Sequence, residues 1–268
     1  MRKDGPGRGH RPDRRRSDPR VRHRPGGGRG RSRRGRPHPQ VAAGLIGTVV
    51  LASIARRRRF EDAWIGPRPR GGQAYRCPDE WKRNDVASSV PELYGRIAER
   101  FGELILNCPP DRWEDPSPCP GWTAWDVVAH VVSNHRRAVA GLDGSGYSAP
   151  GRGEDLAQAW DAASEEVTTA LRDPVKARAL LGEEFGSIPF EEFVRRMACA
   201  DTVIHGWDLA RATGQDEVLD AEAVAVATEI LLPEDGDIRM PRAFGAKVPS
   251  AADANAQTRL LNFLGREV

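Results

Sequence analysis

The chain has 268 residues, with 41 basic and 38 acidic side chains and a formal net charge of +3. This balance hides two unlike parts, because residues 1–70 carry 21 lysines and arginines against 5 acidic residues, whereas the other 198 carry 20 against 33. The acidic part argues against nucleic acid as its own partner. Four cysteines without a CxxC pair or regular spacing argue against a disulfide framework.

Residues 1–75 are predicted to form a disordered tail rich in Arg, Gly and Pro. Stretches such as RPGGGRGRSRRGRP have almost no apolar side chains to bury, so collapse does not offset the chain entropy. Two interpretations of the tail stay open. Its arginines could bind nucleic acid or anionic lipid by releasing counterions. A start codon assigned too far upstream would give similar text, with the core beginning near Val86 or Val90.

An apolar run of 15 residues lies within the tail, at residues 41–55, and four arginines follow it. A membrane-spanning helix needs about 20 apolar residues, so a membrane helix is not favoured. The basic stretch before the run is longer than the n-region of a secretory signal, and no clear cleavage site follows. We therefore expect a cytoplasmic protein.

Residues 84–268 are predicted to form one helical domain, because apolar residues recur there at helical spacing. The expected helices, in chain order, cover 90–106, 124–142, 154–171, 190–213, 221–231 and 256–264, with a loop or short hairpin at 180–189. Thr123 and Asp126 form an expected N-cap pair, and Gly214 is expected to end the fourth helix. The predicted fold class is all-α, a four-helix bundle with short additional C-terminal helices.

The predicted fourth helix carries polar residues on its packed side. Its apolar face comprises Phe190, Phe193, Val194, Met197 and Ile204. At 100° per residue, Asp201, His205 and Asp208 project within about 60° of the centre of that face. Burying them unpaired would cost several kcal/mol, and a divalent metal is one partner that suits the i,i+4 pair. Alternatively, Asp208 pairs with Arg211 or another cation, and His205 hydrogen-bonds to a neighbouring helix.

His130 lies on the second predicted helix, on the stripe opposite its apolar face. Asp126, Asn134 and Arg137 share this stripe. The stripe could be solvated, or it could line a polar cleft in which Asp126 orients the imidazole. His135 lies nearer the apolar face, as a substitute metal ligand or as a hydrogen-bonded core histidine.

His130, Asp201 and His205 together would form a minimal set of ligands for a divalent metal. Two imidazoles and one carboxylate leave coordination positions for water or substrate, and an open site indicates chemistry rather than scaffolding. Outside the tail the chain has only one further histidine. A metal centre therefore has few other nitrogen ligands to use.

Several segments occur in an order that resembles a known family. They are PCPGWTAWDVVAHVV, AWDAA, FGSIPFEEF, DTVIHGWDLARATG and AFGAKVPSAADANAQTRLLNFLGREV. From about Val86 to Val268, the chain resembles the mycothiol-dependent maleylpyruvate isomerase-like metal-binding proteins of actinobacteria, a branch of the DinB-like superfamily. The resemblance implies a DinB-like four-helix bundle that binds a divalent metal, usually zinc, through His130, Asp201 and His205.

The resemblance also implies a metal- and mycothiol-dependent isomerase or S-transferase. The expected partners are a small-molecule thiol and an electrophilic substrate, with a homodimer as a possible assembly. Asp126, Asn134 and Arg137 are expected to contact the thiol or the substrate, while no separate catalytic residue is identified. Trp122 and Trp207 are expected to wall the cleft or to pack in the core. The alternative is a non-catalytic metal-binding or sensor bundle.

Two departures from the family pattern bear on the substrate. Many mycothiol-dependent relatives carry Glu where this chain has Asp201, whose side chain is shorter by one methylene. The sequence also ends soon after the bundle, without the additional C-terminal domain of full-length isomerases. Maleylpyruvate is therefore not expected to be the substrate, and the electrophile stays unidentified.

Overall fold

A computed structural model describes residues 88–236, 238–239 and 244–268 of the chain. This described part is built from helices, with two isolated β-bridges and no longer strand, which confirms the all-α prediction. No helix in these ranges is both long and apolar enough to cross a membrane. The predicted tail at 1–75 and its apolar run at 41–55 lie outside the described residues.

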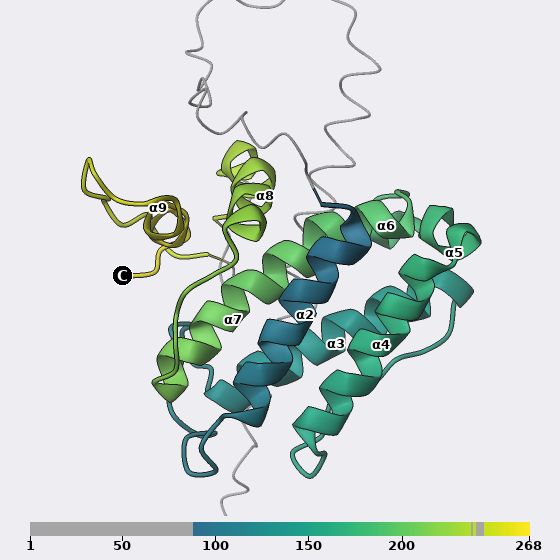
Figure 1. Cartoon of the computed structure of the whole chain (residues 1–268), viewed down its shortest axis with the longest axis horizontal. Helices are drawn as coiled ribbons and strands as arrows, with labels where there is room; N and C mark the ends of the chain where they lie inside the picture. The colour runs from purple at the N-terminus through teal and green to yellow at the C-terminus, as the bar shows by residue number, and fades with distance from the viewer. Residues whose placement is uncertain (1–87, 237, 240–243) are drawn as a thin grey trace, which may run out of the picture. The chain divides into compact units, whose positions relative to one another are not determined.

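Four long helices form the bundle (Figure 1). They are α2 (Val90–Leu106), α3 (Ala124–Asp143), α4 (Leu156–Arg172) and α7 (Ala200–Thr213). Both α2 and α3 pack against α4 and against α7, so α2 and α3 occupy one diagonal of the bundle. The predicted four-helix bundle is therefore confirmed, and the seam between α3 and α7 holds the candidate site.

Shorter helices surround this bundle. They are α5 (Pro174–Arg178), α6 (Phe190–Phe193), α8 (Ala221–Leu231) and α9 (Ala256–Phe263). Helix α8 packs against α7, and α9 packs against α8. Figure 1 shows α8 beside the N-terminal half of α7. The two predicted C-terminal helices are thus confirmed, whereas α5 was not predicted.

The N-terminus of α3 is fixed by the predicted N-cap pair. Thr123 donates from its backbone N and its hydroxyl to Asp126 Oδ2, at 3.0 and 2.9 Å, and Asp126 N donates to Thr123 Oγ1 at 3.3 Å. A cap of this kind stabilises a helix by about 1 kcal/mol. Gly214, which follows the last residue of α7, has a φ of +72°, as predicted for a left-handed residue that ends this helix.

The predicted fourth helix is not one regular helix. A π-helical segment, Val194–Cys199, separates α6 from α7. A π-type turn holds an extra residue, so residues before and after it no longer share a face at regular helical spacing. The predicted common face is accordingly wrong, because Phe190 and Phe193 lie in one buried cluster and Ile204 lies in another, with α8 and α9.

The segment 180–189 and the third helix also differ in detail from the prediction. An antiparallel bridge between Leu180 and Pro189 closes a short turn that contains a 3-10 helix at Glu183–Phe185. Helix α4 begins two residues later than predicted, because Asp155 caps it by accepting from the backbone N of residues 157 and 158.

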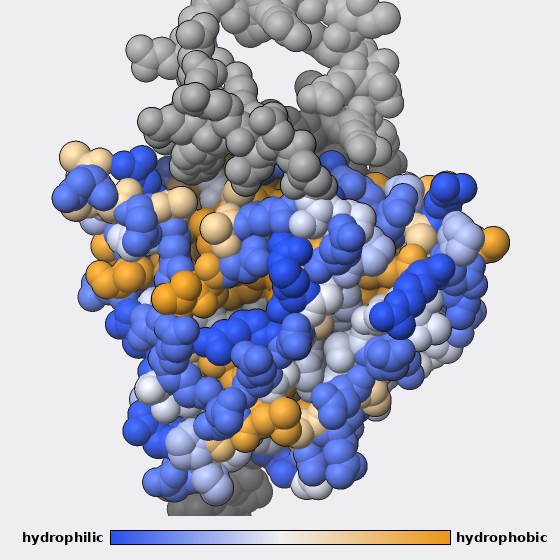
Figure 2. Space-filling view, viewed as in Figure 1, coloured by the Kyte–Doolittle hydropathy of each residue, from blue (hydrophilic) through white to orange (hydrophobic). Residues whose placement is uncertain are grey.

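Apolar side chains pack between the helices in three buried clusters. The first two fill the two halves of the bundle, and the third joins α7 to α8 and α9. Figure 2 shows that the surface over α2, α4, α7 and α8 is mostly hydrophilic, with apolar residues in separate patches. Burial of these side chains is the main stabilisation of the bundle that positions the site.

Candidate metal centre

His130, Asp201 and His205, hereafter the His130 group, meet at the seam between α3 and α7. His130 Nε2 lies 3.2 Å from Asp201 Oδ1, and His205 Nε2 lies 3.5 Å from the same oxygen. One potential ligand atom from each of the three residues lies within 4.8 Å of the others. The structure therefore brings together the three residues that the sequence singled out.

The stripe of α3 that carries His130 faces α7 and not solvent. Every residue from Ala124 to Val132 is buried, and His130 itself is 7% exposed. The interpretation of this stripe as a solvated face is therefore wrong. The alternative, a polar seam inside the bundle, holds for His130 and for Asn134, the residue one turn further on.

Asn134 and Trp122 complete the immediate surroundings of the His130 group. Asn134 Nδ2 donates to Asp201 Oδ2 at 3.1 Å and lies 3.0 Å from His130 Nε2. The ring of Trp122 lies 4.9 Å from that of His130 and stacks 5.7 Å from that of His205. One wall of the site is thus aromatic, and the Asp201 carboxylate is held in place by an amide.

Hydrogen bonding fixes which nitrogen of His205 faces the group. Nδ1 lies 2.9 Å from Asp208 Oδ2, and a carboxylate can only accept, so Nδ1 carries the proton. In the neutral ring, the Nε2 lone pair then points at the Asp201 carboxylate. Two electron-rich atoms in such a position require a cation between them, and either a proton or a metal ion satisfies that requirement.

The pKa values of His205 and Asp201 also show that the His130 group favours a positive charge. Burial alone would lower the pKa of His205, but the charge of Asp201 and the hydrogen bond to Asp208 outweigh it and raise the pKa to about 10. The pKa of Asp201 is held below its usual range, against the effect of burial, by the charges of His130 and His205. These residues fit a divalent cation, because imidazole and carboxylate are common zinc ligands.

Asp208 is the second acidic residue whose partner was left open by the sequence. Its two oxygens accept from Arg266 Nε at 2.8 Å and from Arg266 Nη2 at 2.7 Å, in a buried pair. Arg211 pairs instead with Glu217. The cation that neutralises Asp208 therefore comes from the segment after α9, so of the two partners considered, Arg211 or another cation, the structure shows another cation.

Cys119 joins this outer pair and was not singled out by the sequence. Its Sγ lies 3.1 Å from Asp208 Oδ2 and 3.8 Å from His205 Nδ1. Burial, followed by the charge of Asp208, raises the pKa of the thiol. Cys119, His205 and Asp208, hereafter the Cys119 group, form a second set of potential metal ligands whose atoms lie within 4.8 Å of one another.

The structure places Asp126 and Arg137 in contacts outside the His130 group. Asp126 Oδ2 caps α3, and Asp126 Oδ1 accepts from Arg152 Nη2 at 3.1 Å. Among the described residues, Asp126 makes no hydrogen bond to His130, which was expected to be its partner. The guanidinium of Arg137 lies 4.9 Å from the centre of the Phe185 ring. Of the three residues expected to contact a thiol, Asn134 is the one whose hydrogen bonds reach the His130 group.

His135 is a core residue. Its Nδ1 donates to the carbonyl of Val131 at 2.8 Å, and its ring packs against Tyr94 and Trp160. Burial lowers the pKa of His135 to about 4. The interpretation as a hydrogen-bonded core histidine therefore fits the geometry, with Nε2 left without a partner in the described part of the chain.

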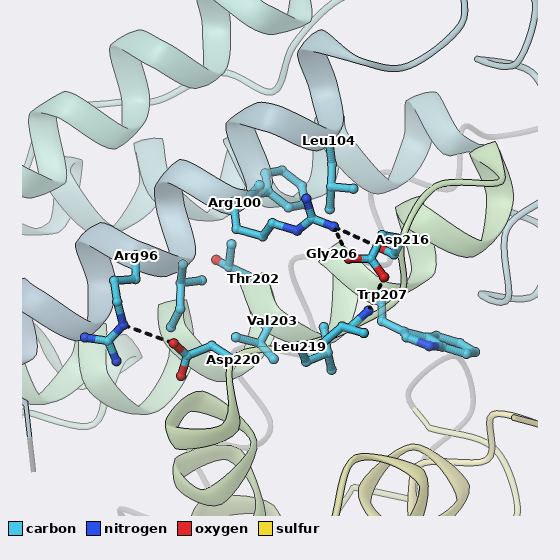
Figure 3. Close-up of a pocket in the computed structure, with 13 residues that line it drawn as sticks. Arg96, Arg100, Leu104, Thr202, Val203, Gly206, Trp207, Asp216, Leu219 and Asp220 are labelled. Carbon is cyan, nitrogen blue, oxygen red and sulfur yellow. Dashed lines mark hydrogen bonds and ion pairs between the residues drawn. The ribbon is translucent and has the colours of Figure 1, made fainter.

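A hollow on another side of α7 contains none of the His130 group (Figure 3). It lies between α2, α7 and the segment after α7, with Thr202, Val203 and Gly206 along α7. Arg96 and Arg100 bridge its rim by ion pairs to Asp220 and Asp216, respectively. Trp207 lines this hollow and is buried, which fits the expected role in the core, whereas Trp122 flanks the His130 group.

Comparisons with known proteins place the chain in a family. Residues 94–210 match the family described as mycothiol maleylpyruvate isomerase N-terminal domain, a span that includes the whole His130 group. Two uncharacterised proteins of Mycobacterium tuberculosis, from strains CDC 1551 / Oshkosh and H37Rv, are each 30% identical over 178 residues. That alignment covers 65% of this chain and 95% of each relative. No solved structure matches the chain.

Proposed function

The chain belongs to the family of mycothiol maleylpyruvate isomerase N-terminal domains, and on that basis we propose that it is a divalent-metal-dependent enzyme that uses mycothiol on a small electrophile. The observation that carries the proposal is the convergence of two imidazoles and one carboxylate from α3 and α7 on one point. Zinc suits this donor set, because catalytic zinc sites use three protein ligands and leave a position open. The electrophile is unidentified.

The chain's own residues supply orientation and shielding. Asp208 accepts a hydrogen bond from His205 Nδ1 and so orients Nε2 towards Asp201. Asn134 holds the Asp201 carboxylate, and Trp122 excludes water from one side. A bound zinc ion would lower the pKa of a coordinated thiol, so that the thiolate is present near neutral pH.

Either of two reactions follows from an ionised thiol held at this position. Addition to a double bond conjugated with a carbonyl, rotation and loss of the thiol would isomerise the substrate. Addition without loss, or displacement of a leaving group, would transfer the thiol. A cytoplasmic location is part of the proposal, since Cys108, Cys119 and Cys199 carry free thiols, as is usual in a reducing compartment.

Metal analysis of the purified full chain tests the metal centre. We expect about one divalent ion per chain in the unaltered protein, and loss of most of it in His130→Ala and His205→Ala, since each variant removes one of three ligands. His135→Ala is the matched control, because it removes a buried histidine of α3 that lies outside the His130 group. Circular dichroism would check that each variant keeps its helices.

Calorimetry with mycothiol then tests the thiol. We expect binding to the metal-loaded protein and at least tenfold weaker binding after the metal is removed with a chelator. Mycothiol binding that is unchanged by metal removal would contradict metal-assisted thiol activation. Stoichiometric metal without any thiol binding would favour the alternative, a non-catalytic metal-binding or sensor bundle.

A further inference from the structure

His205 lies between two groups of potential metal ligands, one at each ring nitrogen. Its Nε2 faces the His130 group, and its Nδ1 faces Cys119 and Asp208. An imidazole, a thiol and a carboxylate are as suitable for zinc as the His130 group is, and a thiolate is the softer ligand. Ligand chemistry alone therefore does not explain why the metal would bind at the His130 group and not at the Cys119 group.

The two groups differ in what already occupies them. Arg266 places its guanidinium against the Cys119 group, with Nη2 at 2.7 Å from Asp208 Oδ2 and 3.5 Å from Cys119 Sγ. Arg266 is 7% exposed, so this positive charge is poorly screened by water. Within the His130 group, in contrast, the neighbouring donor is the neutral amide of Asn134.

We propose that the Cys119 group is a latent second metal site whose cation position is filled by Arg266. The guanidinium supplies the positive charge that Asp208 needs, and it repels a metal ion at the Cys119 thiol and at His205 Nδ1. By excluding a metal ion from Nδ1, Arg266 leaves the hydrogen bond from Nδ1 to Asp208 in place and confines the metal to Nε2. This inference takes metal binding at the His130 group from the proposed function.

Cobalt(II) substitution tests the inference, because a cobalt-bound thiolate gives a charge-transfer absorption in the near ultraviolet that imidazole and carboxylate ligands do not give. The probe is cobalt alone, added in excess to the metal-free full chain. We expect the unaltered protein to bind cobalt without the thiolate absorption. Arg266→Gln is expected to gain that absorption, and Cys119→Ser combined with Arg266→Gln is expected to lose it again.

Two control variants separate the charge of Arg266 from general effects of substitution. Arg259→Gln removes an exposed arginine of α9 whose side chain donates to the Ala252 carbonyl, and it should behave as the unaltered protein does. Arg266→Lys keeps the positive charge and should also exclude cobalt from the thiol. If Arg266→Gln does not fold without metal, cobalt should restore its helical circular dichroism only when Cys119 is present.

The possible outcomes are distinct. Thiolate absorption in the unaltered protein would overturn the inference, and so would a folded Arg266→Gln variant that binds cobalt without it. Failure of cobalt to refold that variant would overturn it as well. Cobalt binding that survives His130→Ala in the unaltered background would instead contradict the proposed function, while the response of the thiolate absorption to Arg266→Gln would still decide the inference.

Discussion

His205 is held between two carboxylates, and its protonation therefore couples to folding. Asp208 fixes the proton on Nδ1, and Asp201 lies 3.5 Å from Nε2. In the metal-free protein a second proton on Nε2 stabilises this arrangement, which is why the pKa of His205 is raised to about 10. A metal ion must displace that proton, so the same residue controls the pH dependence of both stability and metal binding.

We expect the free energy of unfolding of the metal-free protein to fall as the pH rises from about 7 to about 10. The folded-state pKa of His205 lies above its ordinary value of 6.5, so the folded protein binds more protons across this window, and that stabilisation disappears as the pH passes about 10. Urea unfolding at several pH values, with a chelator present, measures the effect. His205→Ala should reduce the slope, and an equally steep slope in that variant would contradict the assignment.

The sequence contained enough information to predict the His130 group but not its surroundings. Asp201 and His205 are one helical turn apart, and the family resemblance added His130. Cys119 and Arg266 carried no such signal, because they lie in segments outside regular helices and reach Asp208 only through the packing of the whole chain. Side chains that meet across 147 residues of sequence do not show a local period.

At the scale of elements, local signals predicted helix ends well and helix continuity less well. Capping residues fixed the start of α3 and the end of α7, because these effects depend on neighbouring residues only. The π-helical turn at 194–199 depends on tertiary packing against several helices, so the hydrophobic periodicity of the sequence did not predict it. It ends two residues before Asp201, and π-type turns often occur near functional residues.

Two helical glycines give opposite predictions for substitution by alanine. A Cβ on Gly206 would meet Phe101 and Leu104 at 3.7 and 3.8 Å, which is ordinary contact, so Gly206→Ala should stabilise the protein by about 0.5–1 kcal/mol. A Cβ on Gly141 would lie 2.8 Å from the buried Phe185 ring, so Gly141→Ala should destabilise it by roughly 1–3 kcal/mol.

Denaturant unfolding of the two variants beside the unaltered protein measures both effects. Metal content should be unchanged in Gly206→Ala, since its new methyl group faces α2 and the hollow of Figure 3. Equal destabilisation by both substitutions would show that the packing of α7 against α2 is tighter than these distances indicate.

At the scale of the whole molecule, charge divides the chain into a basic and an acidic part. Removing residues 1–70 takes away 21 basic and 5 acidic side chains and leaves 20 against 33. The helices of the described residues and the His130 group lie in the acidic part. Binding to polyanions and binding of a metal should therefore be separable.

We expect a variant that lacks residues 1–70 to keep its metal content and its unfolding transition. Its retention on heparin should be lost at low salt, whereas the full chain should be retained and then released as salt rises, because arginine contacts to polyanions release counterions. Persistent heparin binding by the shortened chain would contradict the assignment of polyanion binding to the tail. Loss of metal would show that the tail contributes to the centre.

The contact between Arg266 and Cys119 also has a consequence for biosynthesis. Cys119 and the ligands of α3 and α7 leave the ribosome well before Arg266, which follows Cys119 by 147 residues. A nascent chain therefore presents both faces of the His205 imidazole before the guanidinium arrives. Under the scheme proposed above, a metal ion could bind wrongly at the thiol of the growing polypeptide, and synthesis of the segment that carries Arg266 would end that hazard.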